Sequence, residues 1–329
     1  MKTSLAILCI SAALACLPLF GVSNVALNFL VFALIIALAG QGWNILGGFG
    51  GQYSFGHAAF FGAGAYATAI LQVRYGVNAW VGFVAGIAAG ALVGAAIGFL
   101  AFRSGLKGSY FALVTLAFAE VLRIVASVAP ITGAGVGTLI KLDMRPEAFQ
   151  FQSRAVFYWI ILFLVFISLF IAARLEQTRF GAWLVAVREN EDSARALGVD
   201  VVSIKLRAMM LSAAITAAAG CFYAQYFLFV DSTIAFGSWI SVEALLGPIV
   251  GGGGTVFGPL AGALVVRLLG EAAKLVAGDA PGIDLAIYGA VLVGVVAFAP
   301  RGIVGLATTL AAGARSGNSN AGVGSGNRG

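Results

Sequence analysis

Long apolar runs recur along the chain and are separated by short polar stretches. We place ten of them, at 5–21, 25–46, 55–72, 78–100, 109–128, 154–173, 206–229, 238–252, 256–275 and 282–299. A helix needs about 20 residues to cross roughly 30 Å of hydrocarbon. The runs do not alternate between apolar and polar positions, which excludes the strands of a membrane β-barrel. The pattern predicts an all-α integral membrane protein with about ten transmembrane helices, in the range of 8–10.

Three stretches complicate this pattern. Between 238 and 275 the sequence GPIVGGGGTVFGP interrupts the helix, so the region forms either two spans or a re-entrant hairpin. Residues 1–22 are similar to a signal peptide, but Ala-Leu-Ala is a poor cleavage site, and we favour a retained first span. The glycine- and serine-rich end predicts a disordered tail over 313–329, after a transmembrane domain over 1–312.

The basic residues are distributed unevenly between the two sides of the predicted membrane. If the N-terminus is cytoplasmic, ten crossings return the C-terminus to the cytoplasm, with twelve basic residues inside and four outside. The inside set is Lys2, Arg103, Lys107, Arg174, Arg179, Arg188, Arg195, Lys205, Arg207, Arg301, Arg315 and Arg328, and the outside set is Arg74, Lys141, Arg145 and Arg154. This is a positive-inside bias, and it explains the net charge of +6 without nucleic-acid binding.

Glycines recur at every fourth position of the span 78–100. They are Gly82, Gly86, Gly90, Gly94 and Gly98. This spacing places them on one side of a helix and lets a neighbouring backbone approach closely. We expect a tight helix contact here, within the chain or across a dimer.

Two acidic residues fall inside predicted spans. Glu120 lies near the middle of its span, with Arg123 and Ser127 on the same side of the helix. A lone carboxylate at mid-bilayer costs at least about 2.5 kcal/mol, so an internal partner is expected. Two roles stay open, a Glu–Arg pair that fixes the helix or a group that lines a translocation path. Glu243 has the same two interpretations.

Residues 174–205 form the one substantial polar stretch between spans. Acidic residues at Glu189, Glu191 and Asp192 precede Gly198, which is the arrangement of a short capped helix. Such a helix is suited to docking on a cytosolic partner, and the alternative is a solvated loop. The sequence contains no G-x-x-x-x-G-K-[ST] phosphate loop, so if the protein takes part in ATP-driven transport, the ATPase is another subunit.

Several motifs together resemble one family along nearly the whole chain. GQYSFGHAAFFGAGAY at 51–66 is similar to the S-x-G-H-A-x-F-x-G-x-G-A-Y signature of permease subunits of branched-chain amino acid ABC transporters. GSYFALVTLAFAEVLRIV, ENEDSARALGVDV, VGGGGTVFGPLAGAL and FAPRGIVG match as well, in the order of the LivM-like member of the permease pair. The resemblance implies the bundle of a type II ABC importer, similar to vitamin B12 importers, in the bacterial inner membrane.

The resemblance also implies partners and roles. The expected partners are a second, LivH-like permease, two cytosolic ATPases that bind the ATP, and a periplasmic substrate-binding protein; this chain holds no cofactor. The coupling helix that seats in an ATPase groove corresponds to Glu189, Asn190, Glu191, Ala194, Leu197 and Gly198, with Asp-Ser where Glu-Ala-Ala would lie. The candidate pathway or gating residues are Ser54, His57, Phe61, Tyr66, Glu120 and Glu243.

The substrate is less specified, since permeases for urea, short amides and other small ligands have similar sequences. Leucine, isoleucine and valine are the leading hypothesis. A secondary transporter explains the spans but gives no role to residues 189–198. An enzyme would need a nucleophile and base or a metal set, which one histidine and scattered acids do not provide.

His57 is the only histidine of the chain. A lone histidine in an apolar helix is usually a packing residue with a hydrogen bond, and no other ligand lies at metal-binding spacing. On a helix over 55–72, His57 shares one side with Phe61. We expect a structural or gating histidine held by hydrogen bonds to adjacent backbone.

Overall fold

The computed structural model describes residues 2–277 together with residues 286, 287, 289, 290, 293, 294, 302, 303 and 305. The predicted tail over 313–329 and most of the predicted span over 282–299 lie outside the described residues.

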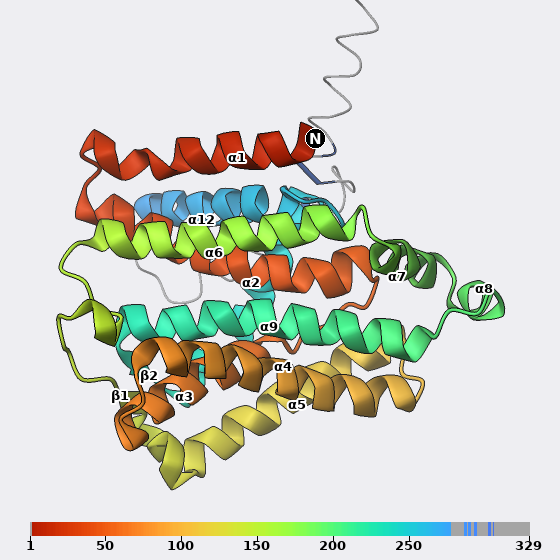
Figure 1. Cartoon of the computed structure of the whole chain (residues 1–329), viewed down its shortest axis with the longest axis horizontal. Coiled ribbons are helices and arrows are strands. Elements are labelled where there is room, and N and C mark those ends of the chain that lie inside the picture. Colours follow the sequence, from red (N-terminus) through yellow and green to blue (C-terminus); the bar gives the residue numbers. More distant parts are fainter. Residues whose placement is uncertain are drawn as a thin grey trace, which may run out of the picture.

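Nine helices of the described chain correspond to the first nine predicted spans. They are α1 (Lys2–Ala15), α2 (Asn24–Trp43), α3 (His57–Tyr75), α4 (Ala79–Arg103), α5 (Gly108–Val128), α6 (Arg154–Leu175), α9 (Val201–Phe227), α11 (Ser238–Gly251) and α12 (Gly258–Ala277). Figure 1 shows most of them lying side by side along one long axis, which makes the structure a helix bundle.

Short elements complete the described chain. α2 continues as a π-helix over Asn44–Phe49, and 3-10 turns lie at Leu17–Phe20, Pro130–Thr132, Ala134–Val136 and Pro146–Ala148. The remaining short helices are α7 (Arg179–Glu189), α8 (Glu191–Ala196) and α10 (Ser232–Ala235). β1 (Thr138–Leu139) pairs antiparallel with β2 (Phe229–Val230), with Thr138 opposite Val230.

Seven helical segments of the described chain are long and apolar enough to cross a membrane. They are Thr3–Phe20, Asn24–Phe49, Ala79–Arg103, Gly108–Val128, Arg154–Leu175, Val201–Phe227 and Ser232–Gly251. α3 and α12 have spanning lengths of 19 and 20 residues but are more polar, and they do not meet that standard. The all-α membrane class is confirmed, whereas the count of ten spans is not.

The glycine-rich region between 238 and 275 forms two helices. α10 and α11 follow each other around a break at Phe236 and Gly237, and the 14 residues of α11 make about 21 Å of helix. α12 has 20 residues and packs along α11 and α2. Because α11 has 14 residues and α12 does not meet the spanning standard, neither two spans nor a re-entrant hairpin is confirmed.

The glycine stripe of α4 makes the tight contact that its spacing predicts, and the contact lies within the chain. α3, α4 and α9 pack against one another. At Gly86 a Cβ would collide with the Gly64 carbonyl, and at Gly98 it would come within 3.0 Å of Met209. Gly90 and Gly94 face alanines of α9 in the same way. The small side chains therefore set the distance between three helices.

The two ends of the bundle differ in the number of basic residues. Figure 1 shows the start of α1, α7 and α8 at one end, which we call the α8 end, and the β1–β2 pair at the other, which we call the β end. By the helix termini, the α8 end holds Arg103, Lys107, Arg174, Arg179, Arg188, Arg195, Lys205 and Arg207. The β end holds Arg74, Lys141, Arg145 and Arg154. The described basic residues are thus sorted as the positive-inside pattern predicts.

Candidate functional site

α8 and the turn after it project from the α8 end of the bundle (Figure 1). Asn190 is the N-cap of α8, and its Oδ1 accepts a hydrogen bond of 2.9 Å from the Ser193 backbone N–H. Gly198 follows the helix with a φ of +86°, which a glycine adopts without strain. The sequence predicts one short capped helix over 189–198; α8 is a capped helix within this range, but Glu189 is the last residue of α7. α7, which precedes it, was not predicted.

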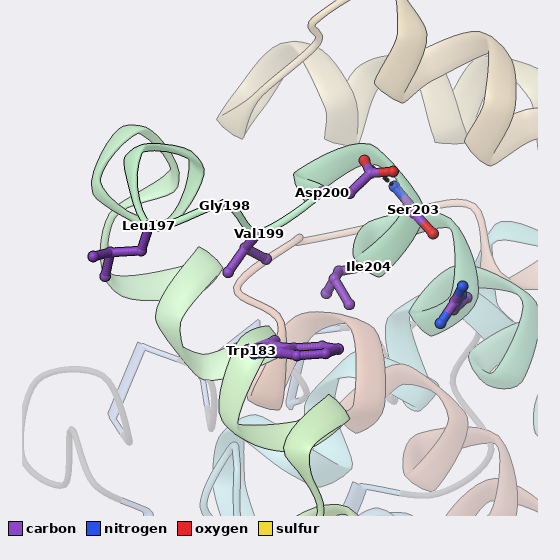
Figure 2. A pocket seen from close by; sticks show the side chains of 8 residues that line it. Trp183, Leu197, Gly198, Val199, Asp200, Ser203 and Ile204 are labelled. Carbon is purple, nitrogen blue, oxygen red and sulfur yellow. Dashed lines mark hydrogen bonds between the residues drawn. The ribbon is translucent and has the colours of Figure 1, made fainter.

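Leu197 is the most outward apolar side chain of this segment. It is 86% exposed, whereas Ala194, one turn earlier, is buried against the bundle. Figure 2 shows Leu197 at the tip of the turn, pointing away from Val199 and Ile204. The turn after α8 therefore exposes an apolar side chain, Leu197, while Ala194 of α8 is buried.

A hollow of about 320 Å³ lies beside this turn. Figure 2 shows Trp183 of α7 below it and Val199, Asp200 and Ser203 around the start of α9. Asp200 caps α9, since its Oδ1 accepts a hydrogen bond of 3.1 Å from the Ser203 backbone N–H. The lining combines apolar side chains such as Trp183 and Ile204 with polar ones such as Asp200 and Ser203.

Glu191 joins α8 to two other parts of the bundle. Its Oε2 lies 3.0 Å from Lys107 Nζ, and its Oε1 accepts a hydrogen bond from Lys205 of α9. Burial would raise the pKa of Glu191, but the hydrogen bonds from Lys205 and Lys107 outweigh it and hold the pKa below its usual value. The carboxylate is therefore charged at neutral pH, and its pairs lose their stabilising effect only as the pH falls through that lowered pKa.

Arg188, near the end of α7, bonds to the π-helix that continues α2. Its Nη1 donates a hydrogen bond of 3.0 Å to the Gly48 carbonyl, and its Nη2 lies 2.7 Å from Glu189. In the same place Asn44 accepts a hydrogen bond of 2.8 Å from the Gly254 N–H and donates one of 2.9 Å to the Thr255 carbonyl. The π-helix, α7 and the α11–α12 turn thus meet at the α8 end.

His57 lies at the start of α3 and is fully buried. Its Nε2 is 2.9 Å from the Ser212 hydroxyl of α9, and the edge of its ring faces Phe60. The next residue is also anchored, because the Ala58 N–H donates a bond of 2.9 Å to the Ser241 hydroxyl of α11. The expected bonds to adjacent backbone are wrong, because a side chain of another helix supplies the partner. The signature motif therefore fastens α3 to α9 and α11.

The other candidates on the signature segment are also buried, Ser54 just before α3 and Phe61 and Tyr66 within it. Ser54 accepts a hydrogen bond of 3.2 Å from the Gly56 N–H, and the Ser54 carbonyl accepts one of 2.8 Å from Trp43. Phe61 packs edge-on against Tyr223, with ring centroids 5.6 Å apart. Tyr66 stacks on Phe236 at 5.7 Å. These contacts pack α3 against α2, α9 and the α10–α11 break.

The two acidic candidates lie in different surroundings. Glu243 of α11 is buried and pairs with Arg267 of α12 at 3.1 Å, and the Arg267 guanidinium lies 4.3 Å from the Phe32 ring centroid. Glu120 and Arg123 form the expected pair at 2.5 Å, but their side chains are 45% and 32% exposed on the outer side of α5. Glu120 therefore lies on the exposed side of α5, whereas His57 and its partner Ser212 are fully buried.

The comparison with known protein families covers most of the chain. Residues 25–296 match the family described as the branched-chain amino acid transport system / permease component. The chain belongs to this permease family.

The permease is also similar to individual relatives. The high-affinity branched-chain amino acid transport system permease protein LivM of Escherichia coli K12 is 29% identical over 311 residues, which are 87% of this chain and 71% of that protein. The LivM protein of Salmonella typhimurium is 28% identical over 310 residues, with the same shares. The L-arabinose ABC transporter permease protein AraH of Azospirillum brasilense is 28% identical over 221 residues, 65% of this chain and 61% of AraH. No solved structure matches the permease.

Sequence reasoning missed the polar partners inside the permease. Ser212 and Ser241, which anchor the signature segment, were not candidates, and neither were Arg188 and Lys205. A signal for Ser212 exists, because it interrupts the apolar run MMLSAAITAAAG and a hydroxyl at that depth needs a partner. Which partner it has depends on helix packing.

We expect Ser212→Ala to lower the free energy of unfolding of the permease by about 1–3 kcal/mol, because buried His57 loses its partner. His57→Ala should cost more, since it also leaves a cavity. The double variant should cost less than the sum of the two. Thermal unfolding in detergent measures this, with Ser168→Ala of α6, whose hydroxyl bonds its own helix, as the control. Strictly additive costs would show that His57 and Ser212 do not interact.

Proposed function

We propose that this permease is the membrane subunit of an ATP-driven importer that moves branched-chain amino acids across the bacterial inner membrane by alternating access. Membership in the permease family carries the proposal. The family makes the chain a transporter component within an assembly of several subunits. The direction, the substrate and the identity of each partner go beyond family membership and are the content of the proposal.

The α8 end faces the cytoplasm in this proposal. Eight of the described basic residues expected in the cytoplasm lie there, and the positive-inside rule favours that side. The N-terminus of α1 lies at the same end (Figure 1). The β end then faces the periplasm, where a substrate-binding protein delivers the ligand.

α8 is the coupling helix in this proposal. Leu197 is exposed at its tip, and a mixed apolar and polar hollow lies beside it. A side chain of this kind is suited to insertion into a groove of a cytosolic ATPase subunit, where apolar anchors give most of the binding free energy. Hydrolysis on two such subunits moves α8, and the helices above it rearrange. A secondary transporter leaves α8 without a role.

Branched-chain amino acids are the favoured substrates because the LivM relatives, which cover 87% of the chain, carry that description. The AraH relative is described as an L-arabinose permease, so the wider group of sequences accepts other small ligands. Ligand choice in this proposal rests mainly with the periplasmic binding protein.

The second, LivH-like permease covers the outer face of α5 in this proposal. Glu120 lies 13th among the 21 residues of α5, so the Glu120–Arg123 pair is at membrane depth. Charged side chains at that depth face a protein interior or a water-filled path rather than lipid. The rest of the face is apolar, with Leu113, Val121, Ile124 and Val128 exposed. An interface that also borders the translocation path satisfies both features.

The substrate is tested with the complex in proteoliposomes. Binding protein loaded with leucine, isoleucine or valine should stimulate ATP hydrolysis, and binding protein loaded with arabinose or urea should not. Radiolabelled ligand uptake measured in the same vesicles confirms import. If no branched-chain binding protein stimulates hydrolysis, the substrate assignment is wrong.

The coupling role is tested with Leu197→Asp. We expect leucine uptake per ATP hydrolysed to fall roughly tenfold, because a charge replaces an apolar anchor at an interface. Gly198→Pro should act in the same direction, since proline cannot adopt the φ of +86°. Leu142→Asp changes an exposed leucine in the connection between α5 and α6 and is the control. Normal uptake per ATP hydrolysed by Leu197→Asp would show that α8 has no coupling role.

The α5 interface is tested with a photo-crosslinking amino acid placed at Val121. It should capture the second permease in membranes that contain the whole complex. The same group at Phe163, an exposed position on α6, is the comparison. Capture of the second permease from Phe163 and not from Val121 would place the interface elsewhere.

A further inference from the structure

We propose that Glu191 is a positioning residue that holds α8 to α9 and to the start of α5, so that displacement of α8 reaches both helices. The inference rests on the proposed coupling role of α8 and adds the side chain that connects it to the bundle. One carboxylate engages two lysines from different elements, Lys205 in the second turn of α9 and Lys107 at the N-cap of α5.

The Glu191–Lys205 pair is buried, unlike the other ion pairs of α7 and α8. The side chain of Glu191 is 14% exposed and that of Lys205 is 4% exposed. The Asp192–Arg195 pair is largely exposed, and in the Arg188–Glu189 pair the side chain of Glu189 is 68% exposed; exposed pairs contribute little to stability. Lys205 Nζ also lies 5.6 Å from the Phe102 ring centroid of α4. A buried charge that loses its partner is strongly unfavourable, so α8 cannot separate from α9 freely.

α9 carries the connection into the bundle. Lys205 and Ser212 are seven residues apart, so they lie two turns from each other on nearly the same side of the helix. Ser212 bonds His57 of α3, and five residues further on Ala217 faces Gly90 of α4. Because these contacts are close-packed, a shift of α9 moves α3 and α4 with it.

α5 receives the second connection. Lys107 precedes the first turn of α5, the helix whose outer face carries Glu120 and Arg123. The Lys107 side chain is 53% exposed, so this pair is weaker than the buried one. α8 is thus tied strongly to the central helix and more weakly to the outer one.

The test uses the whole complex in proteoliposomes, with leucine-loaded binding protein as the stimulus. Glu191→Gln keeps the shape of the side chain and removes both ion pairs. We expect radiolabelled leucine uptake per ATP hydrolysed to fall about fivefold or more, which is the lower range of measured coupling between sites. Lys107→Gln breaks only the exposed pair and should cause a smaller fall. Asp143→Asn breaks an exposed ion pair at the β end, far from α8, and should lower the ratio less than Glu191→Gln does.

A second measurement does not depend on transport. Hydrogen–deuterium exchange of the α8 amides in the purified complex should accelerate in Glu191→Gln, while exchange in α6 stays the same. A merely structural role of Glu191 would lower the amount of folded complex and leave uptake per ATP unchanged.

The results separate this inference from the proposed function. If Leu197→Asp lowers the uptake ratio and Glu191→Gln does not, α8 is a coupling helix and Glu191 does not position it. If neither variant lowers the ratio, the coupling role of α8 and the positioning role of Glu191 are both overturned. Unchanged exchange of α8 in Glu191→Gln would also overturn the role of Glu191.

Discussion

The close approach of α3, α4 and α9 is the constraint on which the rest of the structure depends. At Gly86 and Gly90 of α4 there is no room for a side chain, because backbone of α3 and Ala217 of α9 occupy the space. In lipid there is little hydrophobic drive between helices, so such contact is a main source of their association. With these three helices at a fixed distance, a hydroxyl group as short as that of Ser212 on α9 can reach His57 on α3.

Ion pairs and hydrogen bonds attach the segments that lie outside the packed helices. At the α8 end, Glu191 and Arg188 attach α7 and α8 through ion pairs and a bond to the Gly48 carbonyl. Inside the bundle the polar contacts are mostly uncharged, apart from the buried Glu243–Arg267 pair between α11 and α12. The arrangement combines a rigid interior with a polar attachment point for the segment that projects furthest.

The sequence predicted features that depend on local spacing and missed those that depend on helix packing. Apolar runs located nine helices, and the i, i+3 spacing predicted the Glu120–Arg123 pair, because both signals come from neighbouring residues. The glycine stripe predicted a close contact but could not say that α9 supplies it. The hydrogen-bond partner of His57 was wrong for the same reason, since Ser212 is distant in the chain. α7 was missed because tertiary contacts such as Arg188 to Gly48 hold it.

The polarity of α3 has a consequence for how the chain is made. α3 is less apolar than the other helices before it, so it has a weak tendency to enter a bilayer on its own. Its neighbour α4 follows after a turn of three residues and can cover one side of it at once. His57, however, waits for a serine that is 155 positions later in synthesis. The signature segment is therefore made early, and its contacts are complete only when α9 and α11 have been made.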